Sequence, residues 1–326
     1  GKTEQRPGKY NIGITAGIET NIVSAEFLAG CNRMDLVITT SEHSKKGFIE
    51  SVFDKIDNKT KQKTGSLKLE KPMEVLFEGV DLNVFKKTDN IHDTVKEELS
   101  DIKEDFCYLF VGHWLRGNIG QDRKDVGMMI KTFCEAFKHK SPKNRPGLIL
   151  KTSHAHFSYK DYHIVNKRIQ AITKSYGKDM LNIYLLHGDL TSQEMNSLYN
   201  HPKVKAMVSF TKGEGYGRPL AEFSTTGKPI LSTWWSGQKD FLKHCYRLVG
   251  QVAPLDQSSV WDKVLLEGSN WFHVNYRFAK KAFKDLYVNY KKHTQNAKRQ
   301  KHHINKNFTI EQMNFKMVEI LEQYGP

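Results

Sequence analysis

The stretch Phe210-Thr-Lys-Gly-Glu-Gly-Tyr-Gly-Arg-Pro-Leu-Ala-Glu-Phe-Ser-Thr-Thr-Gly-Lys-Pro229 decides the fold predicted for this chain. Before it, residues 204–210 alternate apolar and polar, which indicates a strand of a buried sheet. Pro219 suits the first position of a helix, where its missing N–H costs nothing. Gly227 suits the end of that helix, and the proline two residues later prevents its continuation. The pattern predicts a strand, a glycine-rich turn, a helix of about two turns and, from Ile230, a second strand.

The turn between this strand and this helix has the features of a phosphate site. Glycines at positions 213, 215 and 217 let the backbone turn tightly and approach a ligand closely. The backbone N–H groups of Gly217, Arg218 and Leu220 have no partner within the helix and face the turn, whereas Pro219 has no N–H. We therefore expect Gly217, Arg218 and Leu220 to bind phosphate.

Two glutamates flank this turn. Glu214 lies in the turn and Glu222 in the first helical turn, with seven residues between them. A carboxylate near a helix N-terminus stays ionised and accepts hydrogen bonds, which suits sugar hydroxyls. Together with the phosphate site, the pair predicts a ligand that carries phosphate and hydroxyl groups, such as a nucleotide sugar. The alternative is one glutamate that caps the helix and one that is solvated.

In this frame the two glutamates resemble the E-x7-E motif of retaining glycosyltransferases of the GT-B fold, family 4 type. The neighbouring segments Gly227-Lys-Pro-Ile230, Trp235-Ser-Gly237 and Asp240-Phe-Leu242 agree with this resemblance. It implies an α/β fold of two Rossmann-like domains whose parallel sheets face a cleft, with the donor bound to the second domain. It also implies that Glu222 binds the nucleotide ribose and that Glu214 contacts the donor sugar and supports positive charge on it.

A second basic loop follows residues 106–111, an apolar segment predicted to be the first strand of the second domain. Gly112, Arg123 and Lys124 fit the family's phosphate signature of a glycine followed by Arg-Lys, ahead of a predicted helix. We expect Arg123 and Lys124 to bind the diphosphate and stabilise its departure, with Arg116 as a substitute. The alternative is a charge pair on a solvated turn.

Three further positions are predicted to lie near the ligand. Lys151 ends the predicted strand 147–151 and either assists the phosphates or is solvated. By the resemblance, the loop that contains His187, Gly188 and Leu190 contacts the nucleotide base, although a lone histidine is more often structural. Glu19 follows a predicted strand and is a candidate for the acceptor side, or a loop carboxylate that caps the next helix.

The resemblance and the element pattern divide the chain into three parts. Residues 1–100 are predicted to form a partial N-terminal, acceptor-side domain and a linker, with residues 44–53 helical and residues 55–71 a surface loop. Residues 101–275 form the nucleotide-sugar domain. Residues 276–326 form helices that cross back to the first domain. The first part is shorter than the corresponding domain of such transferases, so the sequence predicts that the front of that domain is missing.

Two features of the C-terminal helices follow from the pattern of side chains. The last helix is predicted to start after Thr309 and to turn five residues inward, namely Met313, Met317, Ile320, Leu321 and Tyr324. Residues 291–306 are dense in Lys, Arg and His. They form either a solvated helix face or a surface for an anionic acceptor.

Composition limits the class of protein and its partners. The chain has 326 residues, 38% of them hydrophobic, and a formal net charge of +14, which favours polyanionic partners such as nucleotides, nucleic acid or acidic membranes. Four scattered cysteines have no metal-type spacing and are expected to be free thiols in a reducing compartment. No membrane span or signal peptide is visible, so we expect a cytoplasmic location.

The function implied by the resemblance is transfer of a glycosyl group from a UDP-, GDP- or ADP-sugar to a hydroxyl, with retention at the anomeric carbon. No metal is expected, because basic residues carry the phosphate charge and no DxD-like metal site is present. The acceptor is a carbohydrate, a glycolipid or a nucleic acid, and the oligomeric state stays open. One rival is a non-catalytic nucleotide- or nucleic-acid-binding or assembly protein on the same scaffold, and another is an enzyme that glycosylates DNA bases.

Overall fold

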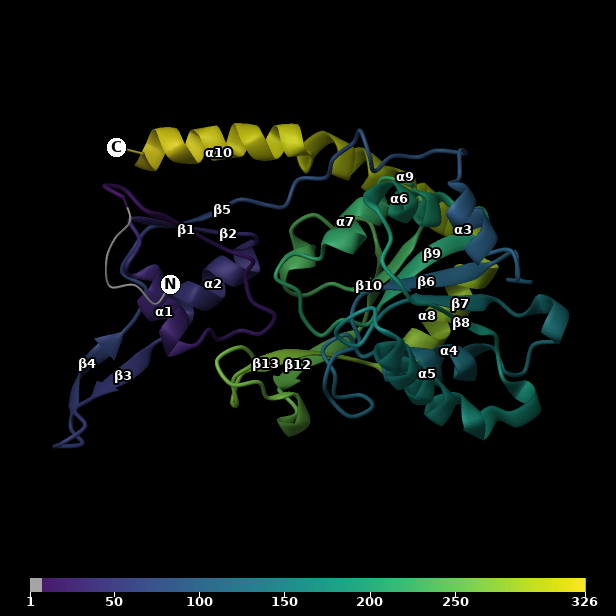
Figure 1. Cartoon of the computed structure of the whole chain (residues 1–326), viewed down its shortest axis with the longest axis horizontal. Helices are drawn as coiled ribbons and strands as arrows, with labels where there is room; N and C mark the ends of the chain where they lie inside the picture. Colours follow the sequence, from purple (N-terminus) through teal and green to yellow (C-terminus); the bar gives the residue numbers. More distant parts are fainter. Residues whose placement is uncertain (1–7, 326) are drawn as a thin grey trace.

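A six-stranded parallel sheet forms the centre of the larger part of the molecule (Figure 1). The computed structural model describes residues 8–325, so the first seven residues of the predicted N-terminal domain and Pro326 lie outside the described residues. The strands follow the order β11-β10-β9-β6-β7-β8, and each pair is parallel. They are β6 (Cys107–Val111), β7 (Gly147–Lys151), β8 (Ile183–Leu186), β9 (Val204–Ser209), β10 (Ile230–Thr233) and β11 (Tyr246–Leu248).

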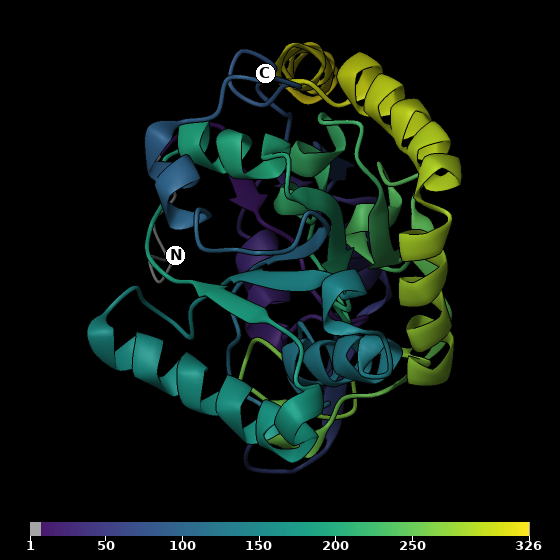
Figure 2. The ribbon, with the colours of Figure 1, turned by 90° about the vertical axis from the view of Figure 1, so that its right-hand side faces the viewer.

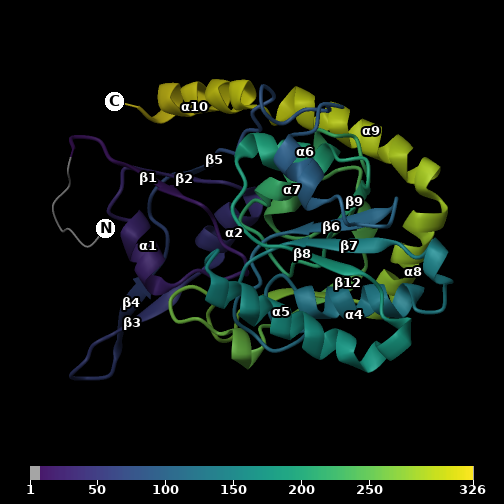
Figure 3. The same ribbon diagram turned by 45° about the vertical axis from the view of Figure 1, so that its right-hand side comes forward.

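Helices cover both faces of this sheet, because its strands are apolar on both sides. On β6, Tyr108 and Phe110 point into one core and Cys107 and Leu109 into the other, as the two-residue period requires. Figure 3 shows the sheet between these two helical layers. One layer contains α4 (Val126–Phe137), α5 (Tyr159–Thr173) and α8 (Tyr276–Val288), and the other α3 (Asp93–Glu98), α6 (Ser192–Asn200), α7 (Arg218–Ser224) and α9 (Tyr290–Asn307).

A smaller three-stranded parallel sheet forms the N-terminal part, in the order β1-β2-β5. One face packs on α1 and α2, and the other on α10, whose Ile320 meets Leu36 and Ile38 of β2. Figure 2 shows α10 nearly end-on, close to α9. The elements are β1 (Ile12–Thr15), α1 (Ala25–Cys31), β2 (Leu36–Thr39), α2 (Glu42–Glu50), β5 (Met73–Val75) and α10 (Ile310–Tyr324).

Three local predictions in the outer parts of the chain were wrong. Residues 55–71, predicted to be a loop, contain most of an antiparallel hairpin of β3 (Phe53–Ile56) and β4 (Lys63–Leu67). Both faces of the hairpin are largely exposed, so its sequence lacks the alternation of apolar and polar residues that would predict strands. The helix predicted over 44–53 is α2, which ends at Glu50. On α10, Leu321 points outward and is 40% exposed, because one turn of that helix places a single residue, Ile320, in the core.

The two parts of the molecule meet where the backbone of one packs directly on the backbone of the other. A Cβ atom added at Gly213 would overlap the carbonyl oxygen of Glu19, and one at Gly215 would overlap that of Ala16. Thr40 Oγ1 also donates to the carbonyl of Gly215, at 3.3 Å. A second hairpin, β12 (Gly250–Pro254) with β13 (Asn270–Val274), adds a contact, since Asn270 N–H donates to Asn21 Oδ1 at 2.6 Å. Glycine in the 213–217 turn therefore lets the N-terminal loop lie directly on it.

Substituting Gly213→Ala should destabilise the protein by about 1–3 kcal/mol, because the new methyl group must push one backbone away from another. Chemical denaturation followed by circular dichroism measures the change. Gly65→Ala is the matched control, since a Cβ there meets nothing within 4 Å. Equal midpoints for the two variants would contradict the close packing of this turn.

Candidate functional site

Glu214 lies between two largely buried cations, 18% and 11% exposed, from the loop that follows a neighbouring strand. It follows β9, while Arg123 and Lys124 follow β6, and the two strands are paired in parallel, so the loops at their carboxyl ends meet. Arg123 Nη1 lies 3.0 Å from Glu214 Oε2, and Lys124 Nζ donates to Glu214 Oε1. The Glu214 side chain is 9% exposed. Burial alone would raise the pKa of Glu214, but the charges of Lys124 and Arg123 outweigh it and lower this pKa to about 2.

Glu19 joins this group from the N-terminal part of the molecule. Its Oε1 lies 3.7 Å from Arg123 Nε. The structure thus brings together four residues singled out in the sequence, and we call Glu19, Arg123, Lys124 and Glu214 the Arg123 cluster. It holds two cations and two carboxylates at the junction of the two parts of the molecule.

A buried lysine anchors the loop that bears Arg123 and Lys124. Lys212 is fully buried, and its Nζ donates to the carbonyl of Gly120 at 2.5 Å and lies 3.2 Å from Asp256 Oδ2. Its backbone N–H donates to the carbonyl of Arg123 at 2.7 Å. These bonds tie the loop after β6 to the loop after β9. The backbone that bears Arg123 and Lys124 is therefore positioned by a buried side chain.

Glu222 occupies a separate position. Its Oε2 accepts a hydrogen bond from Tyr199 Oη at 3.0 Å, and its Oε1 lies 3.2 Å from Arg218 Nε. Burial raises the pKa of Glu222 to about 7, although Arg218 and Tyr199 act in the opposite direction. This raised pKa means that the carboxylate is only partly ionised near neutral pH, whereas the sequence predicted that it would stay ionised. It lies at the fifth of the seven residues of α7, beyond the first turn.

The backbone groups predicted for phosphate are only partly available. Gly217 has φ = 102°, a left-handed conformation that favours glycine, and it caps α7. The Leu220 N–H already donates to the carbonyl of Gly217 at 3.0 Å. Leu220 therefore does not offer a free donor. Arg218 turns its side chain toward Glu222 and keeps 69% of it exposed.

Lys151 and His187 meet at the carboxyl ends of β7 and β8. Lys151 Nζ donates to the carbonyl of Gly188 and lies 4.6 Å from the centre of the Phe157 ring. His187 Nε2 lies 3.1 Å from Asp161 Oδ2. The Leu190 N–H bonds its neighbour Asp189, at 3.0 Å from Oδ1. The structure thus joins Lys151 to the predicted base loop rather than to the Arg123 cluster.

Two predicted loop residues have other roles. Arg116, the substitute phosphate ligand, lies 4.8 Å from the centre of the Trp261 ring and donates to the carbonyl of Val260, which removes it from the Arg123 cluster. Gly112 has φ = 151°, and a Cβ there would come within 3.3 Å of Lys124 Cε. Gly112 thus leaves space for the lysine.

A cavity of about 470 Å³ adjoins the base loop and was not predicted from the sequence. Its volume lies within the range of about 300–1,000 Å³ that small-molecule sites occupy. The signal available in the sequence was the dense run of aromatic residues and histidines after β7. The cavity is lined by Glu98, Phe157, Tyr159, Tyr162, Leu185 and His187.

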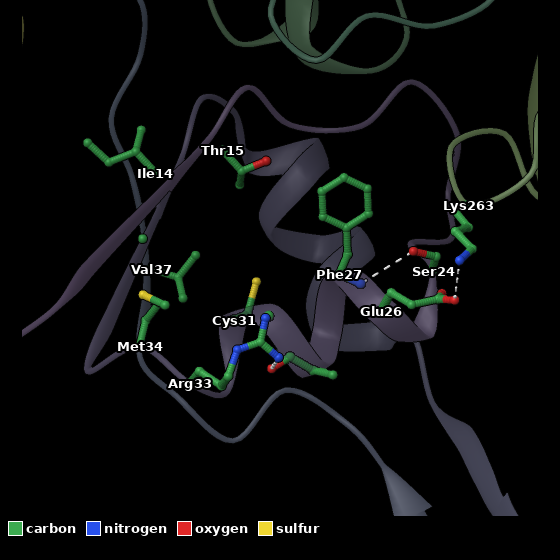
Figure 4. Close-up of a pocket in the computed structure, with 13 residues that line it drawn as sticks. Ile14, Thr15, Ser24, Glu26, Phe27, Cys31, Arg33, Met34, Val37 and Lys263 are labelled. Atoms are coloured by element: carbon green, nitrogen blue, oxygen red, sulfur yellow. Dashed lines mark hydrogen bonds and ion pairs between the residues drawn. The ribbon is translucent and has the colours of Figure 1, made fainter. Parts of the chain in front are cut away.

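A second cavity, of about 940 Å³, lies between β1 and α1 (Figure 4). Phe27, Met34 and Val37 line it, and its walls are mainly apolar. Glu26 and Lys263 turn toward one another beside it, with Nζ 3.3 Å from Oε1. None of the predicted site residues lines this cavity, and the chemistry of its walls does not suit a diphosphate.

Within residues 8–325, no three or more His, Cys, Asp or Glu side chains gather in a way that would hold a metal ion. In the same range, no helix combines the length and the apolar character needed to cross a membrane.

The fold is that of the GT-B glycosyltransferases, which confirms the predicted fold class. Sucrose-phosphate synthase from Thermosynechococcus elongatus is 13% identical, with a TM-score of 0.60 over 91% of this chain and 60% of that chain. Anabaena HepE in complex with UDP and glucose is 15% identical, with a TM-score of 0.60 over 95% of this chain and 71% of that chain. A glycosyltransferase from Rickettsia africae is 13% identical, with a TM-score of 0.60 over 96% and 70%.

The chain spans 60% of the length of the matched sucrose-phosphate synthase. No protein-family model matches the sequence, and no curated protein matches it significantly. The structural likeness therefore establishes the fold, and the activity must be argued from the site.

Substituting Glu214→Gln should destabilise the protein by up to about 3–5 kcal/mol, because the largely buried Lys124 would lose its carboxylate partner and Arg123 would keep only Glu19, at 3.7 Å. Urea denaturation at pH 7 measures this change. Glu50→Gln is the matched control, since its pair with Lys46 is exposed and is worth about 1 kcal/mol or less.

The difference in stability between the wild type and Glu214→Gln should depend on pH. The pKa of Glu214 falls from an ordinary 4.5 to about 2 on folding, so its contribution is present above pH 4.5 and is lost as pH falls toward 2. Glu214→Gln should lack this acid-side loss. An acid limb of equal size in the variant would show that Glu214 is not ion-paired.

Proposed function

We propose that this protein is a retaining glycosyltransferase that transfers a sugar from a nucleoside diphosphate sugar to a hydroxyl group. The observation that carries the proposal is the Arg123 cluster. Two largely buried cations and a buried carboxylate meet in the loops after β6 and β9, in a fold shared with GT-B glycosyltransferases. Ligands of open α/β sheets bind outside the carboxyl ends of the strands.

The order of the strands arranges the groups for one extended donor. Glu214, the pair Arg123 and Lys124, Lys151 and His187 follow β9, β6, β7 and β8, which are successive neighbours in the sheet. Neighbouring strands lie about 4.8 Å apart, so this row is roughly 14 Å long. We assign the sugar to Glu214, the diphosphate to Arg123 and Lys124 and the base to the His187 end, with the donor bent so that its ribose reaches Glu222 on α7. A solved structure of HepE contains UDP-glucose, which supports a donor of this kind.

The cations supply the charge that the reaction needs. The bond from the anomeric carbon to the diphosphate breaks, and its electron pair leaves with the diphosphate. The acceptor oxygen bonds the same carbon from the same face and loses its proton to the departing diphosphate oxygen. Arg123 and Lys124 stabilise the charge that develops on the diphosphate, so we propose that no metal is required. When the diphosphate takes these cations, the Glu214 carboxylate is released to face the positively charged sugar.

Glu222 is assigned to the ribose. Near neutral pH it exchanges between the acid and the carboxylate, since its pKa is about 7. A ribose hydroxyl can donate to the carboxylate form or accept from the acid form. Tyr199 already holds one oxygen of Glu222, which leaves the oxygen on the Arg218 side for the sugar.

One observation favours the non-catalytic alternative. Arg123 and Lys124 are already neutralised by Glu214 and Glu19, and the N-terminal loop lies on the glycine turn. A protein that never binds a diphosphate would gain stability from this arrangement. Binding of nucleotides separates the two proposals.

Calorimetric titration with UDP, GDP and ADP should show one of them binding in the presence of EDTA. Its 2′-deoxy analogue should bind about tenfold more weakly, because a ribose hydrogen bond is lost. Glu222→Ala should remove this difference, because it leaves no polar group for the ribose hydroxyl, whereas Glu319→Ala, at an exposed residue on α10, should keep it. Failure of all three nucleotides to bind would favour the non-catalytic alternative.

Retention is tested on the hydrolysis of the donor by water. With the α-linked nucleoside diphosphate sugar of the base that binds, proton NMR should show the α-anomer of the free sugar before mutarotation. The β-anomer as the first product would contradict a retaining mechanism.

A further inference from the structure

Asp161 connects the two loops that border the 470 Å³ cavity. It is the third residue of α5, and its carboxylate accepts hydrogen bonds from the backbone N–H groups of the loop after β7, at 2.7 Å from His154, 2.8 Å from Ala155 and 3.3 Å from His156. It also lies 3.1 Å from His187 Nε2, in the loop after β8. Asp161 is 5% exposed. One buried carboxylate therefore fixes both loops.

The protonation state of Asp161 determines which nitrogen of the His187 ring carries the hydrogen between the two side chains. Burial alone would raise the pKa of Asp161, but the bonds from Ala155, His154 and His187 lower it to about 2. An ionised carboxylate only accepts hydrogen bonds, so His187 Nε2 must carry the proton between the two side chains. With that proton on Nε2, Nδ1 of His187 has no hydrogen-bond partner among residues 8–325.

Rings surround His187 on the cavity side. The centroids of Phe157 and Tyr162 each lie 5.6 Å from that of His187, and both pairs are edge-to-face. Tyr159, which also lines the cavity, is 78% exposed. Large aromatic rings left open to a cavity offer stacking surface to a planar ligand. Glu98, His187 and the two tyrosines are the polar side chains in the wall.

We propose that Asp161 is a positioning residue that fixes His187 as a hydrogen-bond acceptor, so that the planar base bound in this cavity is selected for an N–H donor. This inference rests on the proposed function and deepens it, because it names the part of the donor that the site reads. A base whose facing N–H is methylated leaves Nδ1 without a partner and is rejected.

The first test reads the histidine tautomer and needs no ligand. Nitrogen and carbon NMR shifts of the imidazole distinguish the two neutral forms, and comparison with His187→Phe assigns the signal among the 14 histidines. The wild type should carry its proton on Nε2. Asp161→Asn should shift the population toward the Nδ1-protonated form, because the amide can donate to Nε2. A wild-type ring protonated on Nδ1 overturns the proposal.

The second test measures selection of the base. UDP, GDP and ADP are titrated beside N3-methyl-UDP, N1-methyl-GDP and N6,N6-dimethyl-ADP. The nucleotide that binds should lose about tenfold in affinity on methylation in the wild type and less than about twofold in His187→Phe. If UDP binds, 5-methyl-UDP is the matched control, since it adds a methyl group and keeps the N–H.

The outcomes separate this inference from the proposed function. Binding without discrimination against the N-methylated base overturns the inference alone. Absence of binding by every nucleotide overturns both. If Asp161→Asn does not fold, His187→Phe and the wild-type tautomer decide the question.

Discussion

The ion pairs of Glu214 with Arg123 and Lys124 are the interaction on which the rest of the site depends. Three charges buried at one point are tolerated only because each has a partner, and removal of one leaves the others without compensation. The pairs also fix the geometry, because they join the loops that follow β6 and β9. The Lys212 bonds hold the same loops from beneath. In the proposed reaction the cations keep their positions, while Glu214 gives up its pairs with them to the diphosphate.

The second constraint is the contact between bare backbones at the junction of the two sheets. Glycine at positions 213 and 215 brings the loop that bears Glu19 onto the turn that bears Glu214. A residue of the N-terminal part then reaches Arg123, at 3.7 Å. The sugar and its acceptor would both have to enter here, so the same contact that stabilises the molecule also restricts access. In the proposed reaction, donor binding exchanges one carboxylate for a diphosphate at fixed cations.

The sequence predicted the layers better than it predicted the loops. Apolar runs, capping residues and glycines predicted strands β6 to β10 and helices α6 and α7. The motif around Glu214 indicated the fold. The ion pair of Arg123 with Glu214 was not predicted, because it depends on the pairing of β6 with β9, two strands that are far apart in the sequence. The sequence does not show which of the polar side chains are buried. Burial raises the pKa of Glu222, and the packing of the exposed Arg116 on Trp261 is likewise not visible in the sequence. Asp161 was overlooked because its partners are backbone groups and a histidine in another loop.

The most direct measurement is a crystal structure of this protein with UDP, or with whichever nucleoside diphosphate binds most tightly. The account predicts diphosphate oxygens within hydrogen-bond distance of Arg123 and Lys124, a ribose beside Glu222 and a base against His187. A nucleotide bound elsewhere, for example in the apolar cavity beside α1, with the Glu214 pairs unchanged, would contradict the assignment of the donor site.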